Sequence, residues 1–390
     1  MRKFKKIMIY MLITIAALIL VKVIWVVCGT WGFNGSPESE KSDIMGRRAF
    51  LIDKVVTTPQ NLIDEMPSIV GQHFQGEWAI YSCSMTAMAL ANIADMYPET
   101  RQDAITNIDK IVEIIMSDEV KWYDAHSWGE DPLVNMETSR KDHMSYRSLL
   151  AWAIGSYKRA GGDGKYDALY HKLCETMNRQ VLESPNMNLR TFPGNPVFVP
   201  DMLVTFVALA QYARFYNGKY QSTVNKWVKM ARASWLEKKT GLLAAYLPYH
   251  KVPINASGLE VRGSYIALSV YYLSLIDPDF AREQYDLMKQ HFVQTSPVPA
   301  IKEFTAGNKW LAGDIDAGPV FFNLSPSGTA FAVGPATYFE DYSLRRKLLT
   351  TAEIAGHSWK WGGKKHYLIA KWALVGEAIT LAMKTTRAHY

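Results

Sequence analysis

The sequence predicts an all-α protein in which an N-terminal transmembrane helix precedes helical hairpins closed into an (α/α)6 toroid. A long apolar stretch stands near the N-terminus, and apolar and amphipathic helical segments alternate along the rest of the chain. Turns within each helix pair are short, whereas connections between pairs are long. These patterns divide the chain into a membrane anchor (1–30), a linker with packing helices (31–70) and the toroid (71–390).

The apolar stretch, IMIYMLITIAALILVKVIWVVC (7–28), is long enough to cross a bilayer. Its one charge, Lys22, stands near the far end, where a lysine can extend its ammonium group to the interface. Basic residues at positions 2 to 6 precede the stretch, and Glu38 and Glu40 follow it. This asymmetry predicts a single-pass protein with a cytoplasmic N-terminus and a periplasmic or extracellular main domain. A cleaved signal peptide is the alternative, but the sequence has no A-x-A-like cleavage site.

Helical periodicity then predicts a first amphipathic helix over 41–56 and a last apolar helix over 367–385. Between them we expect five pairs, each an apolar helix followed by a more polar one: 76–100 with 101–117, 144–162 with 163–182, 201–218 with 219–236, 261–277 with 278–292, and 327–340 with 341–356. The repeat has a period of roughly 50 to 65 residues, which is typical of repeated helical hairpins. Because the first helix then needs the last as its partner, the pattern favours a closed ring over an open solenoid.

The connections place function at one end of this ring. Turns such as YPET, YNGK and DPD join the helices of a pair, whereas the pairs are connected by 118–143, 185–200, 237–260 and 293–326. Since all hairpins run the same way, every long connection falls at the end where the apolar helices begin. Long loops on a rigid scaffold commonly carry function, and helix N-termini favour anionic groups.

Carboxylates and aromatic residues gather at this predicted end. The candidate catalytic residues are Asp314, Asp201 and Glu77, and the candidate substrate-binding residues are Trp78, Tyr81, Trp128, Tyr146, Arg147, Arg262, Trp310 and Asp316. Rings that stack on pyranose faces beside acids that act on the glycosidic oxygen are what a sugar-cleaving cleft needs.

Several of these residues also have ordinary structural interpretations. Glu77 and Asp201 could be acids that stabilise the start of a helix, and Asp316 could form a turn. His126 and His143 are interpreted as surface or structural residues. We expect Arg147 and Arg262, which lie on apolar faces, each to pair with a carboxylate.

The segment GDIDAGPVFFNLSPSGTAFAVG (313–334) holds two carboxylates beside an apolar run. Residues two apart in an extended loop share a face, so Asp314 and Asp316 are too close to be a general acid and its distant base. We expect Asp314 to face the cleft opposite Glu77 or Asp201. Asp316 should be held by loop N–H groups or an arginine, where it would orient a Gly318-Pro319 turn that starts the next apolar helix.

Three segments resemble the linalool dehydratase-isomerase-like group of (α/α)6 proteins: YRSLLAWAIGSYKRAGGDGKY, GNPVFVPDMLVTFVALAQY and DIDAGPVFFNLSPSGTAFAVG. The likeness covers most of residues 70 to 385. It implies catalytic cysteines near FPGNPVFVPD and a histidine in MSYRSL, but this chain has Phe192 and Asp201 at the cysteine positions and Tyr146 or Ser148 at the histidine position. The resemblance therefore implies the fold and leaves that group's own reaction in doubt.

Composition narrows the function further. The chain has no basic stripe with interleaved aromatics, so no nucleic-acid partner is expected, and its three cysteines form no C-x-x-C pair, so neither a metal nor a cofactor is expected.

Three functions stay open. The first is a membrane-anchored hydrolase that cleaves a small-molecule or polysaccharide substrate with a carboxylate pair, inverting if the pair stands roughly 6.5–9.5 Å apart. The second is a lyase or isomerase that moves a proton with a tyrosine or aspartate in an apolar pocket. The third is a non-catalytic binding or scaffold protein of the cell envelope.

Overall fold

The computed structural model describes residues 2–30, 37–249, 259–305, 311–314, 317–371 and 373–387, and most of these are helical. The predicted helical class is therefore confirmed. The helices are α1 (Arg2–Thr30), α2 (Pro37–Val55), α3 (Pro59–Asp64), α4 (Gly71–Met96), α5 (Arg101–Ile115), α6 (Asp118–Trp128), α7 (Met144–Ala160), α8 (Asp167–Glu183), α9 (Val199–Phe215), α10 (Gln221–Ser234), α11 (Gly263–Ser274), α12 (Pro278–Phe292), α13 (Pro326–Tyr338), α14 (Tyr342–Gly356) and α15 (Leu374–Thr385).

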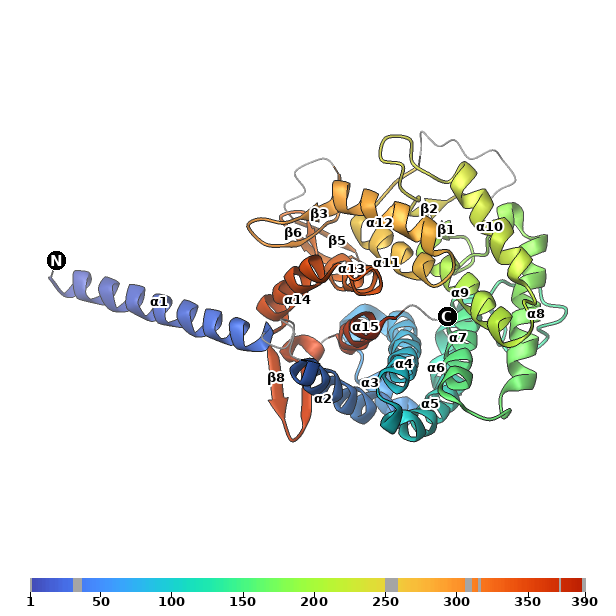
Figure 1. The fold of residues 1–390 in the computed structure, drawn as a ribbon, viewed down its shortest axis with the longest axis horizontal. Coiled ribbons are helices and arrows are strands. Elements are labelled where there is room, and N and C mark those ends of the chain that lie inside the picture. Colours follow the sequence, from blue (N-terminus) through green and yellow to red (C-terminus); the bar gives the residue numbers. More distant parts are fainter. Residues whose placement is uncertain are drawn as a thin grey trace.

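Six apolar helices form the centre of the molecule. Helices α4, α7, α9, α11, α13 and α15 contact one another in that order, and α15 packs against α4 (Figure 1). Helices α5, α8, α10, α12 and α14 each pack on the apolar helix that precedes them in sequence. The division follows from the side chains, because α9 and α11 are buried almost all round whereas α10 and α12 bury one face only.

Glycines allow close approach where α11 begins. A Cβ added to Gly263, the first residue of α11, would stand 1.8 Å from the carbonyl oxygen of Lys302. Lys302 ends the strand β4 (Ala300–Lys302), and the backbone N–H of Gly263 donates to the carbonyl of Glu303 at 2.9 Å. The glycine therefore seats the strand directly against the start of the helix.

The long connection between α12 and α13 folds differently from the loop that the sequence predicts. With the end of α12 it forms a five-stranded antiparallel sheet in the order β3-β4-β7-β6-β5, from β3 (Val293–Gln294), β4, β5 (Leu311–Asp314), β6 (Gly318–Phe321) and β7 (Leu324–Ser325). The expectation that Gly318-Pro319 starts the next apolar helix is wrong. Gly318 has φ 68° and begins β6, and α13 begins only at Pro326, capped by the Ser325 hydroxyl.

Two further segments differ from the prediction. Helix α6 occupies the first half of the connection 118–143, where a loop was expected. The last helix begins at Leu374 rather than at residue 367, because β8 (Ser358–Trp361) and β9 (Lys364–Tyr367) pair as an antiparallel hairpin. Gly362 and Gly363 both have positive φ in its turn.

Helix α1 stands apart from the rest of the chain, and Figure 1 shows it extending outward from the region of α14 and β8. Its segment Phe4–Val26 is long and apolar enough to cross a membrane, by length and composition. Its last turns contact α14.

Candidate functional site

Tyr81, in the third turn of α4, meets the first turn of α9 in a polar contact. The Tyr81 hydroxyl of α4 donates to Asp201 Oδ1 of α9 at 3.1 Å, and Thr191 Oγ1 donates to Asp201 Oδ2 at 2.8 Å. Asp201 is thus held through both of its oxygens, in an orientation fixed by two separate elements. The contact brings together two residues that the sequence singled out, Tyr81 and Asp201.

Glu77 stands one helical turn before Tyr81 on α4. Burial, followed by the charges of Asp201 and Glu77, raises the pKa of Tyr81 well above its usual value. Tyr81 therefore remains a protonated donor to Asp201. The side chains of Glu77, Trp78, Tyr81 and Asp201 are all partly exposed, so solvent reaches this group.

A row of aromatic rings links this group to the start of α11. Phe198, which precedes α9, lies 5.4 Å from the Tyr246 ring between centroids, and Tyr246 lies 5.1 Å from Tyr265 of α11. Phe198 and Tyr246 are also partners in the short antiparallel pair β1 (Val197–Phe198) and β2 (Tyr246–Leu247). The beginnings of α9 and α11 therefore lie close together, and α9 contacts α4 through Asp201.

Arg262 lies directly before α11 and pairs with a carboxylate, which confirms that expectation. Its Nε donates to Glu303 Oε1 at 2.7 Å, and its Nη1 donates to the Tyr246 hydroxyl at 2.7 Å. The guanidinium also lies over the Tyr265 ring, 5.0 Å from its centroid. Glu303 in turn accepts from the backbone N–H and the hydroxyl of Ser264, so the pair fastens the sheet to the start of α11.

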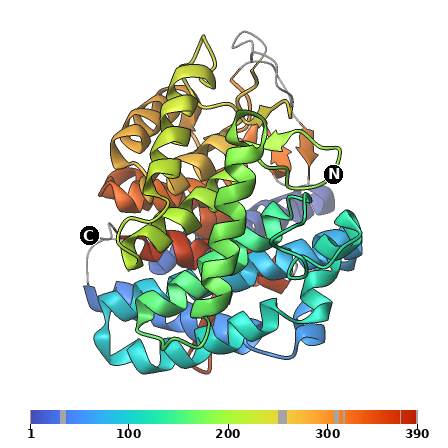
Figure 2. The ribbon, with the colours of Figure 1, turned by 90° about the vertical axis from the view of Figure 1, so that its right-hand side faces the viewer.

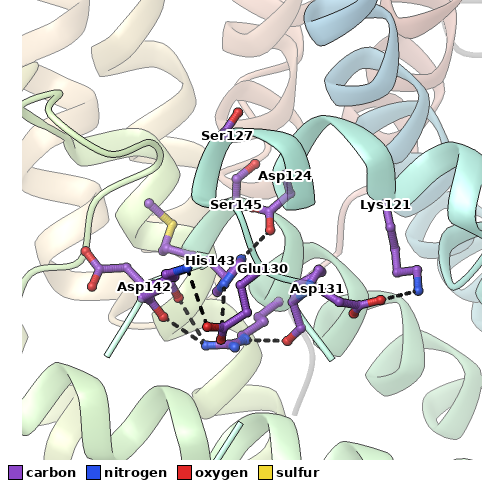
Figure 3. Close-up of polar contacts among 12 residues, drawn as sticks. Lys121, Asp124, Ser127, Glu130, Asp131, Asp142, His143 and Ser145 are labelled. Carbon is purple, nitrogen blue, oxygen red and sulfur yellow. Dashed lines mark hydrogen bonds and ion pairs between the residues drawn. The ribbon is translucent and has the colours of Figure 1, made fainter. Parts of the chain in front are cut away.

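A second polar group lies under the connection between α6 and α7 (Figure 3). A hydrogen bond of 2.5 Å joins His143 Nδ1 to Asp124 Oδ2, and both side chains are fully buried. On the other side of the ring, His143 Nε2 lies 4.0 Å from Glu130 Oε1. The imidazole therefore stands between two carboxyl groups.

The backbone at His143 is strained. It has φ 46° and ψ 31°, a left-handed conformation that is uncommon for any residue other than glycine. Such strain persists where surrounding contacts hold it, and it gathers at functional sites.

Unsatisfied polar atoms collect in the same place. Among the described residues, five buried side-chain atoms of this group have no hydrogen-bond partner: Asp124 Oδ1, Trp128 Nε1, Glu130 Oε1, His143 Nε2 and Arg147 Nη2. Buried polar atoms are rarely left without a partner, so these five atoms have unused capacity for hydrogen bonds.

The pKa values of the two carboxyl groups beside His143 are shifted in opposite directions. Burial raises the pKa of Asp124, although the His143 hydrogen bond acts against it. The Ser139 hydroxyl, above all other contacts, lowers the pKa of Glu130. One ring nitrogen of His143 therefore faces a carboxyl group with a raised pKa and the other faces one with a lowered pKa.

Arg147 makes no ion pair with a carboxylate of the described residues, contrary to the expectation from sequence. Its Nε donates to the Pro132 carbonyl at 2.8 Å and its Nη1 to the Lys141 carbonyl at 3.2 Å. Burial lowers its pKa to about 10. The connection wraps around the guanidinium and presents backbone carbonyls in place of a carboxylate, so Arg147 shapes the loop.

Two other candidate binding residues lie inside the protein. Tyr146 is fully buried, and its hydroxyl donates to the Ile115 carbonyl at 2.8 Å. Trp128 packs 5.5 Å from His143 and carries the Arg190 guanidinium 5.3 Å above its ring. As candidates for substrate binding they remain untested.

The remaining candidates lie at the edge of what the structure describes. Trp310 and Asp316 fall outside the described residues. Asp314 ends β5 and pairs through its backbone with Gly318, and nothing is described of its side chain. That Asp314 faces Glu77 or Asp201 therefore stays a prediction.

The described side chains also bear on metal binding and on catalysis by a thiol. Among these, no group of three or more His, Cys, Asp or Glu residues is arranged to hold a metal ion. Cys83 and Cys174 are buried, and burial raises the pKa of both thiols, which disfavours the nucleophilic thiolate.

His143 is buried rather than at the surface, and whether its role is structural or catalytic stays a prediction. The sequence held one signal of its position, since His143 directly precedes an apolar helix at the end of a long connection, as Arg262 does.

Comparison with protein-family models gives no match, and comparison with curated proteins gives no significant match. The function must therefore be argued from the site.

Proposed function

We propose that this protein is a membrane-anchored (α/α)6 toroid that binds a carbohydrate at the end carrying the long connections and hydrolyses it by acid–base catalysis. The circuit of contacts from α4 through α15 and back to α4 supports a closed ring. Six apolar helices, each accompanied by a more polar partner, are what the toroid requires once α2 is paired with α15, which it contacts.

The observation that carries the proposed activity is the contact of Tyr81 and Thr191 with Asp201. Two hydroxyl donors orient the carboxylate and favour its charged form, which suits a general base that activates water. Glu77 on α4, or Asp314 on β5, is the partner acid that would protonate the leaving oxygen. Trp78 and Tyr81 supply rings on which a sugar could stack.

The anchor sets the location. In this proposal α1 crosses the membrane once, with the basic residues at positions 2 to 6 in the cytoplasm and the rest of the chain periplasmic or extracellular. The substrate is then an envelope or external glycan. A reporter fused after residue 60 should be active only outside the cytoplasm, and activity only in the cytoplasm would reverse the orientation.

The test of the activity is a glycan screen of the full chain in detergent. Asp201→Asn and Glu77→Gln should each lower turnover by about 10²- to 10⁴-fold, the usual worth of a general acid or base. Asp286→Asn, on the exposed face of α12, is the matched control and should leave turnover unchanged. Asp314→Asn should abolish turnover with little loss of stability, whereas Asp316→Asn should lower the melting temperature.

A second function, a lyase or isomerase, rests on a different observation. His143 is hydrogen-bonded to Asp124, and its Nε2 has no hydrogen-bond partner among the described residues and lies 4.0 Å from Glu130 Oε1. A buried imidazole with one free nitrogen suits proton transfer to carbon. The resemblance to the linalool dehydratase-isomerase-like group adds no support for this reaction, because that group's catalytic cysteine and histidine positions are not matched in this chain. Such an enzyme would incorporate deuterium from solvent at carbon without cleaving a glycosidic bond, and His143→Gln would stop the incorporation. A chain that binds glycans but transforms none would instead be a binding or scaffold protein.

A further inference from the structure

We infer that the protein has a second contact with the bilayer, made by a surface next to the end of α1. This surface, the lipid platform, consists of Ile354, Trp359, Trp361, Leu368 and Ile369. It rests on the proposed role of α1 as a membrane anchor, and it adds that the main domain lies directly on the lipid headgroups in a fixed orientation.

The end of α1 and the lipid platform form one packed unit. The Trp25 ring stacks on His357, with centroids 4.2 Å apart, and lies 6.2 Å from the Trp359 ring. Lys22 Nζ contacts His357 Nδ1, and Val26 is buried against the main domain. Trp359 is therefore held at the level where the apolar segment Phe4–Val26 ends. Tryptophan is enriched at that depth, where bilayer and water meet.

The lipid platform exposes large apolar side chains. Trp361 is 77% exposed and Trp359 45%, while Ile354, Leu368 and Ile369 are each more than 40% exposed. All five come from residues 354 to 369, and the backbone N–H of Leu368 bonds the carbonyl of His357. Elsewhere outside α1 the exposed large apolar side chains of the described residues are Ile69, Val134, Leu182, the adjacent pair Phe321 and Phe322, and Tyr342. A gathered apolar surface beside a membrane anchor marks a membrane contact.

The hairpin β8–β9 presents its tryptophans away from the main domain. Trp359 and Trp361 are two residues apart in β8 and share a face of the strand. The alternate residues contact α2, since Ser358 Oγ accepts from Arg47 and Lys360 Nζ donates to Ser42 Oγ at 3.4 Å. Trp361 is thus largely exposed, whereas Trp359 is covered in part by Trp25 of α1.

Charge complements the apolar side chains. A hollow of about 480 Å³ lies between α1 and the hairpin, with Val21, Ile24 and Trp25 on one side and Lys360 and Lys365 on the other. Glu353 also lines it, and the oxygens of this carboxylate accept from the backbone N–H and the hydroxyl of Ser358. Lys365 pairs with Asp43, whereas Lys360 is exposed and makes no ion pair with any described residue. An apolar wall facing lysines fits an anionic lipid, with the acyl chain along α1 and the phosphate near Lys360.

The contact has a consequence for the proposed site. Figure 1 shows α1 in the plane of the view while α4 and α15 are seen nearly end-on, and Figure 2 shows the same helices from the side. The ring axis therefore runs across the direction of α1. With α1 crossing the bilayer and the lipid platform resting on it, the end that carries Tyr81 and Asp201 opens sideways along the membrane surface.

The test places probes on the full chain in nanodiscs of phosphatidylcholine and phosphatidylglycerol. In a Cys28→Ser background the two remaining cysteines are buried, so a single added cysteine takes an environment-sensitive fluorophore. Trp361→Cys reports on the platform, Leu182→Cys on α8 is the exposed control, and Leu18→Cys reports on α1. Quenching by spin-labelled lipid and by aqueous iodide is measured at each position.

We expect the probe at 361 to show blue-shifted emission, quenching by the spin-labelled lipid and loss of iodide quenching, as at 18, whereas the probe at 182 is quenched by iodide alone. Lipid quenching at 18 with iodide quenching at 361 would overturn the platform and leave the anchor standing. Iodide quenching at both would overturn the anchor and the platform together. In phosphatidylcholine alone the quenching at 361 should fall while that at 18 is kept, and an unchanged value at 361 would overturn the role given to Lys360.

Discussion

Replacing Arg47 tests how the first and last helices are fastened together. Arg47, on α2, is fully buried and pairs with Glu377 of α15 and with Asp43 of its own helix. Its Nη2 donates to Ser358 Oγ at 2.7 Å, and its guanidinium lies 4.1 Å from the centre of the Tyr367 ring. One side chain therefore ties α2, α15 and the hairpin β8–β9.

The magnitude follows from what Arg47→Met leaves behind. Asp43 keeps Lys365 at 2.6 Å and Lys384, so its charge stays compensated. Glu377 keeps only the backbone N–H of Tyr367, at 2.9 Å, among the contacts of its carboxylate with described residues. Removing one partner of a buried ion pair costs about 3–5 kcal/mol, because the other charge stays buried without it. We expect that loss in the free energy of unfolding.

The assay is equilibrium denaturation of the full chain in detergent. Arg140→Met, at an exposed position outside the ion pairs of the described residues, is the control and should change stability by less than about 0.5 kcal/mol. The double variant Arg47→Met with Glu377→Gln should be more stable than Arg47→Met alone, since it removes the stranded charge. A single variant as stable as the control, or a double variant that adds the two losses, would refute the reasoning.

Three further outcomes are expected. Gly263→Ala should lower the free energy of unfolding by about 1–3 kcal/mol, because the new Cβ meets the Lys302 carbonyl. Gly376→Ala, whose new Cβ would have its nearest neighbour 3.9 Å away, should stabilise α15 slightly. Equal effects of the two variants in denaturation would contradict the close approach at Gly263. Asp341 caps α14 and contacts Lys289 and Tyr285. Burial alone would raise the pKa of Asp341, but these contacts outweigh burial and lower the pKa. Because the folded state then binds fewer protons than the unfolded state, the stabilisation by the Asp341 carboxylate is present above pH of about 4 and is lost as the pH falls through the folded pKa. Asp341→Asn, which keeps the cap, should be less stable than the parent at pH 7 and equal to it in acid. A stability difference that persists unchanged in acid melts would show that the charge of Asp341 is not its cause. His143→Gly should relieve the left-handed strain yet lose the Asp124 contact, so it should melt below His143→Asn, and the reverse order would show that strain outweighs the contact.

Helical periodicity located the hairpins well because burial imposes it. The expected pair 261–277 and 278–292 corresponds to α11 and α12, and the short DPD turn between them survives as the Asp277 cap of α12. Apolar residues repeat with the helical period wherever a helix packs against two neighbours, so the pattern can be read without knowing the neighbours.

The strands were harder to predict. In HSWKWGGKKHY (357–367) the Gly-Gly turn between alternating residues is a hairpin signal, but the apolar run that follows reads as a continuous helix. The sheet between α12 and α13 likewise depends on pairing between strands that are short and separated by turns, such as Ile301 with Ser325. Long-range pairing of this kind leaves little trace in local sequence.

The sequence predicted which residues gather at one end of the molecule, but not the contacts that their side chains make. The loop asymmetry put Glu77, Tyr81 and Asp201 at one end, yet the hydrogen bond between Tyr81 and Asp201 joins residues far apart in the chain. The partners of Arg147 were mistaken because backbone carbonyls, which every residue carries, took the place of a carboxylate. Periodicity indicates the face of a helix and not what a loop will present to it.

The most direct test of the proposed activity is the turnover of a glycan panel by the full chain and by Asp201→Asn. The account predicts that the parent hydrolyses at least one glycan and that Asp201→Asn binds the same glycan but hydrolyses it about 10²- to 10⁴-fold more slowly. An Asp201→Asn variant that turns over glycans as fast as the parent, or a parent that cleaves none of them, would contradict it.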